Sequence, residues 1–150
     1  MEFDVRSLYE QLILDHYKHP RNYCKMLDQI THTAEGFNPL CGDQLRIDLE
    51  IKDDAIIGAT FNGQGCAIST ASASLMLEHI KCLTKYQAEQ LFNIMHEMFL
   101  GREIEHGQIP TKLTVLEGVK NFPTRIKCAT LPWHTLHAAF QQSTKKITTE

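Results

Sequence analysis

The stretch from Asp43 to Asn62 reads DQLRIDLEIKDDAIIGATFN, and it decides the fold because it holds two strand patterns around a short turn. Apolar and polar side chains alternate through its first half, which is typical of a strand with one buried and one exposed face. Asp53 and Asp54 form the turn, and residues 56–62 supply the second strand. So short a connection predicts an antiparallel hairpin. A segment near residues 31–34 is expected to add an edge strand.

Helical patterns surround this hairpin on both sides in the sequence. Helices are predicted before Pro20, over residues 67–82, 85–99 and 113–119, and from about residue 125 to 142. Pro132 predicts a kink or a later start in the last of them. The sequence therefore predicts an α+β fold, with a small antiparallel three-stranded sheet packed against about five helices and a metal site at one end of the sheet. The chain is expected to form one domain over residues 1–150, with a frayed tail from about residue 143.

Composition limits the function further. The chain has 150 residues and a net charge of −3, so nothing in it favours a nucleic acid or an anionic membrane as partner. There is no long apolar run, and the first residues are acidic where a signal peptide would be basic. We therefore expect a cytoplasmic protein. In that compartment, its five cysteines are better explained as metal ligands, reactive thiols or core residues than as disulfides.

Three of the cysteines share a context that the other two lack. Cys41 lies in a Pro/Gly turn just before the first long strand, and Cys66 lies in a glycine loop just after the second. An antiparallel hairpin brings these two residues to the same open end. Cys128, at the start of the final helix, could be a third corner, and Asp43 is close enough to Cys41 to point at the same place. Of the other two, Cys24 is expected to be a free linker thiol and Cys82 to pack near a helix end.

Three thiolates and one carboxylate make a four-ligand set. Such a set suits zinc, whose usual ligands are Cys, His and Asp or Glu. It also suits an iron–sulfur cluster, which is held mainly by thiolates. The spacing contains no Cys-x-x-Cys knuckle, and a carboxylate is a more labile ligand than a fourth thiolate, as expected of a site that opens. Three unrelated thiols remain the alternative.

The same residues resemble a known family. The motifs are NPLCGD at residues 38–43, GQGCAISTAS at 63–72 and RIKCATLPW at 125–133, with the opening segment from Leu8 to Asn22. In this order and register they resemble the scaffold-type iron–sulfur assembly proteins of the IscU/NifU-N class, up to about residue 142. Two departures from the plain IscU pattern resemble the SufU subgroup. Lys127 stands where IscU has a histidine, and residues 101–116 look like an insertion.

The SufU resemblance implies a ligand set, a partner and a reaction. It implies a zinc ion bound by Cys41, Asp43, Cys66 and Cys128, and a SufS-type cysteine desulfurase as partner. In the family, zinc passes to a desulfurase ligand and frees the residue corresponding to Cys41 to accept persulfide sulfur. Arg125 and Lys127 would then either favour a thiolate at Cys128 or form a solvated helix end.

Three functions follow as expectations. The first is a zinc-dependent sulfur acceptor in iron–sulfur cluster assembly, at most a sulfurtransferase, with Cys41 as the persulfide acceptor. The second is a scaffold on which a [2Fe–2S] cluster, held by Cys41, Cys66 and Cys128, is built and passed to acceptor proteins. The third is a purely structural zinc module. The missing histidine at Lys127 favours the first over the second.

Overall fold

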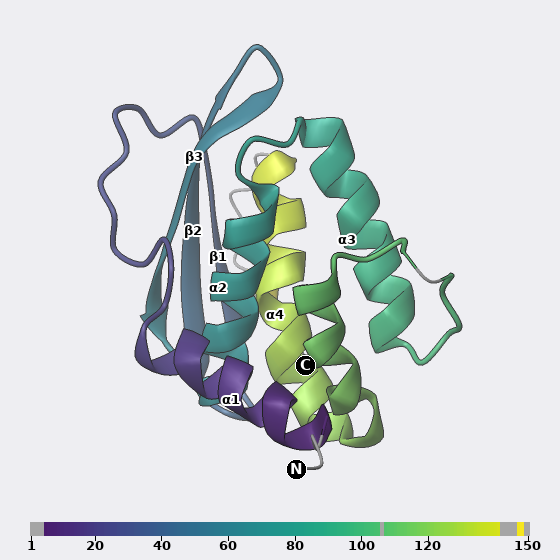
Figure 1. Ribbon diagram of the computed structural model, residues 1–150. Helices are drawn as coiled ribbons and strands as arrows, with labels where there is room; N and C mark the ends of the chain where they lie inside the picture. The colour runs from purple at the N-terminus through teal and green to yellow at the C-terminus, as the bar shows by residue number, and fades with distance from the viewer. Residues whose placement is uncertain (1–4, 106, 142–146, 149–150) are drawn as a thin grey trace.

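The computed structural model describes residues 5–105, 107–141 and 147–148 (Figure 1). The elements, in chain order, are α1 (Val5–Lys18), β1 (His32–Asn38), β2 (Asp43–Lys52), β3 (Ala55–Gln64), α2 (Ala67–Ile80), α3 (Lys85–Phe99), the 3-10 helix η1 (Thr111–Asn121), α4 (Pro123–Phe140) and β4 (Ile147–Thr148). The predicted α+β fold is confirmed, with three antiparallel strands and five helices among the described residues. No helix in this part of the chain is long and apolar enough to cross a membrane.

The sheet is built on the hairpin that the sequence predicts. Its strand order is β3-β2-β1-β4, with β2 antiparallel to both β1 and β3. At the open end of the hairpin Gln44 pairs with Gln64 and Leu45 with Gly63, so the residues that flank these strands meet at one end of the sheet. The short strand β4 pairs with β1 in parallel, at Gly36 and Phe37. This strand differs from the frayed tail that was expected, although residues 142–146 and 149–150 lie outside the described residues.

Helices cover one face of the sheet in two layers. Figure 1 shows α2 and α4 against the sheet, α3 farther out and α1 across one end. The inward side chains of the sheet meet α2 and α4 in a single core, whose fully buried members include Ile47, Leu49, Ile56, Leu75, Met76, Leu77 and Trp133. Helix α3 begins with a capping box, in which Thr84 and Gln87 bond to each other's backbone N–H groups. The two helices that pack on the sheet, α2 and α4, are stabilised mainly by their packing in this core rather than by intrinsic helix propensity.

Two local predictions are wrong. For the last helix the alternative of a later start is wrong, because the helix begins at Pro123 and continues through Pro132. Proline is well tolerated at a first helical position, where its missing N–H would have had no partner anyway. Cys82 does not pack in the core but is exposed, with φ at +75°. The chain turns there to leave α2, and its N–H donates to the carbonyl of Ile56 at 2.9 Å.

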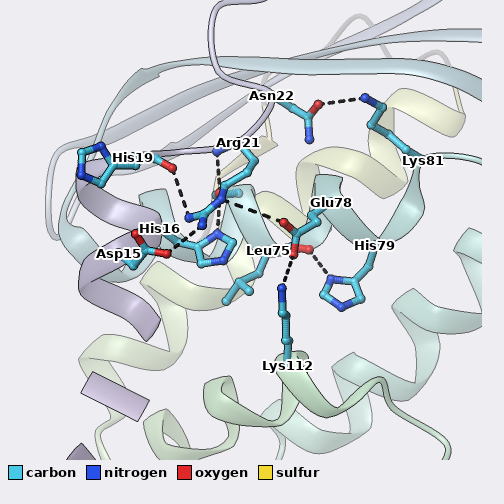
Figure 2. A network of polar contacts seen from close by, with 11 residues as sticks. Asp15, His16, His19, Arg21, Asn22, Leu75, Glu78, His79, Lys81 and Lys112 are labelled. Atoms are coloured by element: carbon cyan, nitrogen blue, oxygen red, sulfur yellow. Dashed lines mark hydrogen bonds and ion pairs between the residues drawn. The ribbon is translucent and has the colours of Figure 1, made fainter. Parts of the chain in front are cut away.

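A polar cluster fixes the end of α1 to α2 and η1, and we call it the α1 anchor (Figure 2). Its members are Asp15, His16, Arg21, Ser74, Glu78 and Lys112. The hydroxyl of Ser74 joins the imidazole Nδ1 of His16 at 2.7 Å and the backbone N–H of Arg21 at 2.8 Å. The guanidinium of Arg21 donates to Asp15 at 2.7 Å, and this bond holds the pKa of that carboxyl below its usual value. The anchor ties the first helix to the core through side chains far apart in the sequence.

His16 and His19 do not share a site. His16 is fully buried within the α1 anchor, whereas His19 is exposed and its ring lies apart in Figure 2. Burial lowers the pKa of His16, and the neighbouring charge of Arg21 adds to the effect. Its Nε2 atom has no hydrogen-bond partner among the described residues. The polar segment around this pair predicts two solvated side chains, which is correct for His19 and wrong for His16.

Candidate metal centre

The turn between β1 and β2 carries the first two site residues. Asn38 and Asp43 face each other as the last paired residues of the two strands, and Cys41 lies in the turn between them. The backbone N–H of Gly42 donates to the carbonyl of Asn38 at 2.8 Å, and Gly42 has φ at +74°, a conformation that suits glycine. The turn leaves Cys41 exposed and Asp43 buried. One side chain is thus accessible to a partner while the other is held in place.

The glycine loop after β3 brings Cys66 to the same end. A Cβ atom at Gly63 would collide with the backbone carbonyl of Gln44, so only glycine lets the strands approach here. A Cβ atom at Gly65 would lie 3.2 Å from Oδ1 of Asp43. The backbone N–H of Cys66 donates to that same oxygen at 2.8 Å. The loop therefore places Cys66 directly against the Asp43 carboxylate at the open end of the hairpin.

Cys128 completes the arrangement from α4. Its side chain is fully buried, and its Sγ atom lies 3.2 Å from the Sγ of Cys41. The Sγ atoms of Cys41 and Cys128 and a carboxylate oxygen of Asp43 all lie within 4.8 Å of one another. Three of the four predicted ligands are thus gathered at one point, although they come from positions 41, 43 and 128 of the chain.

The fourth predicted ligand, Cys66, lies beside this group rather than within it. Its Sγ atom is 3.9 Å from Oδ2 of Asp43. The same sulfur caps α2, since it accepts the backbone N–H of Ser69 at 3.4 Å. The Cys66 sulfur therefore lies at the N-terminal end of α2, where backbone N–H groups lack helical partners.

Asn38 is a site residue whose role the sequence analysis did not assign. It is fully buried, and its side-chain amide donates to Oδ2 of Asp43 at 3.3 Å and to the Sγ of Cys128 at 3.5 Å. Its own Oδ1 accepts the backbone N–H of Leu40 at 3.3 Å. The signal was present in the motif NPLCGD, but the role depends on the strand register that sets Asn38 opposite Asp43. Asn38 orients two of the three gathered side chains.

The site collects electron-pair donors and no cation. Asp43 is 1% exposed, and among the described residues no basic side chain forms an ion pair with it. Burial raises the pKa of the Cys128 thiol strongly, and the hydrogen bond with Cys41 and the charge of Cys66 add to this. A buried carboxylate and crowded thiols are costly unless a positive charge compensates them. These residues therefore fit a bound metal cation, and their sulfur-rich set suits zinc or iron.

Arg125 and Lys127 do not supply that positive charge. Arg125 is exposed and Lys127 half-buried, one turn or less from Cys128 on α4. Among the described residues, neither side chain forms a hydrogen bond or an ion pair. The solvated helix end is the interpretation that this arrangement favours for both residues.

Comparison with known proteins places the chain among proteins of iron–sulfur assembly. It is 41% identical over 133 residues to the zinc-dependent sulfurtransferase SufU of Bacillus subtilis, covering 89% of each chain. It is 36% identical over 140 residues to the iron–sulfur cluster assembly scaffold protein IscU of Thermotoga maritima, covering 91% of this chain and 95% of that one. These two relatives carry names that correspond to the first two functions expected from the sequence.

A solved structure shows the same fold. It is a putative iron–sulfur cluster assembly scaffold protein for the SUF system from Fervidobacterium islandicum AW-1, with a TM-score of 0.78 and 32% identity. The match covers 91% of this chain and 98% of that one. Residues 8–129 also match the family described as the NifU-like N terminal domain, a span that includes Cys41, Asp43, Cys66 and Cys128. On these grounds, the chain belongs to the NifU-like N-terminal domain family.

Proposed function

We propose that this protein accepts persulfide sulfur from a SufS-type cysteine desulfurase on the thiol of Cys41 and passes it into iron–sulfur cluster assembly. The observation that carries the proposal is the contrast between two thiols 3.2 Å apart, Cys41 exposed and Cys128 buried, beside a buried carboxylate. Only Cys41 in this group is presented to a partner. The 41% identity to a protein named as a zinc-dependent sulfurtransferase supports the same reaction.

The proposed transfer needs no external oxidant or reductant. The Cys41 thiolate attacks the outer sulfur of a persulfide on the desulfurase cysteine. A bond forms between the Cys41 Sγ atom and that sulfur, while the sulfur–sulfur bond of the donor breaks. The electron pair leaves with the desulfurase thiolate, and the product is a persulfide on Cys41. The exposed position of Cys41 suits an in-line approach by a thiol from another chain.

Cys41, Asp43, Cys66 and Cys128 are the proposed ligands of a zinc ion. A bound zinc ion would keep these thiols deprotonated and would compensate the buried charge of Asp43. Asn38 holds Asp43 and Cys128 in orientation through its amide. Groups that hydrogen-bond to metal ligands in this way tune both ligand geometry and affinity.

A second function uses the same residues. The name of the Thermotoga maritima relative supports a scaffold on which an iron–sulfur cluster is assembled and handed to acceptor proteins. Thiolates are the usual cluster ligands, so the donor set alone does not separate the two functions. Metal content does: we expect a colourless protein with one zinc per chain after aerobic purification. A brown protein with stoichiometric iron and sulfide after anaerobic purification would place the scaffold function first.

Sulfur transfer tests the role of Cys41 directly. The desulfurase is loaded with labelled cysteine, and the label on this protein is measured together with desulfurase turnover. We expect Cys41→Ser to lose both labelling and stimulation. Cys24→Ser and Cys82→Ser are matched controls, because both thiols are free and exposed but lie outside the metal centre. If Cys41→Ser accepts label as the controls do, the proposed acceptor is wrong.

A further inference from the structure

A second group of titratable side chains lies where α3 packs on α4, and we call it the histidine cluster. It consists of His96 on α3 and His134 and His137 on α4, arranged around the ring of Phe92. None of these residues belongs to the metal centre, and the proposed sulfur transfer does not use them. In the contact between α3 and α4, these imidazole rings stack on an aromatic side chain as apolar rings would.

The rings form one stacked assembly. His137 lies parallel to Phe92 at 4.7 Å between ring centroids, and His96 is stacked with the same ring at 5.9 Å. His134 meets Phe92 edge-on at 5.6 Å and His96 at 5.5 Å. The rings of His96 and His137 both stack on Phe92, so the histidines do not converge on one position where an ion could bind. The cluster is not among the groups whose ligand atoms gather as a metal site in the described residues.

The hydrogen bonds of His137 fit the neutral ring. Its Nε2 atom is 3.1 Å from the amide nitrogen of Gln141, which can only donate, so Nε2 carries the lone pair. Its Nδ1 atom is buried and has no partner among the described residues. A protonated imidazole has two N–H donors and no acceptor. Adding a proton to His137 would therefore break its bond with Gln141 and place a charge on a half-buried ring whose Nδ1 atom has no partner among the described residues.

No carboxylate among the described residues acts on the pKa of the His134 ring. Burial lowers the pKa of His134, and the charges that act on it come from His96 on α3 and His137 on α4, both of the same sign. No charged group of η1, α2 or the sheet is among them. Three acids on α3, η1 and α2 form ion pairs with other side chains: Glu97 with Arg102, Glu117 with Lys120, and Glu78 with Lys112.

We propose that the histidine cluster makes the α3–α4 contact sensitive to pH, so that protonation of its rings loosens α3 from α4 while the hairpin and the metal centre stay folded. A ring that is neutral in the folded protein but free to bind a proton when released favours the folded contact only at higher pH. Here the folded-state pKa of His134 lies below the unfolded value of about 6.5. The contribution is therefore fully present above that value and is lost as the pH falls through it.

Hydrogen exchange measured by helix tests this proposal on the zinc-loaded full chain. Amide protection is compared at pH 7.5 and pH 6.0, after correction for intrinsic exchange, with zinc content measured at both values. We expect protection of α3 to fall by about threefold to fourfold, because a released ring with a pKa of about 6.5 becomes mostly protonated between pH 7.5 and pH 6.0. Protection of β2 and β3 should change much less. Equal loosening of all elements, or no change in α3, would overturn the proposal.

The variant His134→Gln, combined with His137→Gln, keeps polarity but removes the titration. Its α3 should respond to pH less than twofold, whereas His19→Gln, at an exposed histidine outside the cluster, should respond like the unmodified protein. A double variant that keeps the full response contradicts the proposal. Should the double variant fail to fold, a proton NMR titration of the unmodified chain replaces it. There the His134 ring must titrate below the ordinary histidine pKa of about 6.5, and a midpoint at or above that value would contradict the proposal as well.

Discussion

Two clusters of polar side chains converge on α2 from separate elements, and they differ in one respect. In the α1 anchor each charge has an opposite partner: Arg21 lies 2.7 Å from Asp15, and Lys112 lies 3.3 Å from Glu78. In the metal centre sulfur atoms and a carboxylate are gathered without a basic side chain from the described part of the chain, and the groups that donate to them are an amide and backbone N–H groups. The α1 anchor, whose charges neutralise one another, stabilises the fold. A cluster made only of electron-pair donors is complete when a cation is supplied from outside.

The largest effect is expected from removing a proposed ligand of the metal centre. Cys128→Ala should weaken zinc binding by about 100- to 1,000-fold, because one of four ligands carries roughly a quarter of the 10–16 kcal/mol typical of structural zinc sites. Metal analysis and competition with a chromogenic chelator measure this loss. Cys82→Ala is the matched control, since its thiol is exposed and remote from the cluster. If Cys128→Ala bound zinc with unchanged affinity, the donor cluster would not be the zinc site, and the contrast with the α1 anchor would fail.

The α1 anchor should respond in the opposite way. Ser74→Ala removes the one hydroxyl shared by His16 and Arg21 and leaves two inward-facing groups without a partner. The expected loss in the free energy of unfolding is about 2–3 kcal/mol, because buried polar groups without partners cost about 1–3 kcal/mol each. Urea unfolding of the metal-free and zinc-loaded protein measures it.

Zinc affinity serves as the second readout for Ser74→Ala. It should stay within about twofold of the unmodified protein, because Ser74 makes no contact with the metal centre. If Ser74→Ala lost zinc without losing stability, the α1 anchor and the metal centre would be coupled. That result would contradict the contrast drawn between them.

The contrast also explains what could be predicted from the sequence. The alternating strand residues predicted the hairpin, and the hairpin alone implied that Cys41 and Cys66 meet at its open end. The role of Asn38 was not predictable in this way, because its two bonds depend on the strand register and on where α4 brings Cys128. A periodic pattern reports which residues face the core, but it does not report which polar atoms pair across elements.

The α1 anchor was missed for the same reason. His16 stands in a polar, basic segment that favours a solvated side chain, yet it is fully buried against Ser74, 58 positions away. Cys82 shows the reverse case: the helical pattern predicted packing, but the chain leaves α2 after Ile80 and the residue turns outward with φ at +75°. Both errors arise where a helix ends, since side-chain burial there depends on the path of the following loop.

Asn38→Ala sharpens the comparison within the metal centre itself. The residue is not a proposed ligand, but its amide contacts both Asp43 and Cys128. Loss of a group that orients metal ligands typically weakens metal binding by about 10- to 100-fold. Zinc competition should therefore place this variant between Cys128→Ala and the unmodified protein. An effect as small as that of the Cys82→Ala control would mean that the ligands hold their positions without Asn38.

The smallest effect is expected from an ion pair that lies outside both clusters. Arg102 contacts Glu97 with two bonds of 2.9 and 2.7 Å, as short as the bond between Arg21 and Asp15. The side chains of Arg102 and Glu97 are 63% and 42% exposed, so water and salt screen the pair. Arg102→Ala should thus cost less than about 1 kcal/mol of unfolding free energy, as exposed pairs usually do. If Arg102→Ala lowered the free energy of unfolding as much as Ser74→Ala does, short donor–acceptor distances alone would determine the stabilisation. The α1 anchor would then owe nothing to burial or to the hydroxyl that its members share.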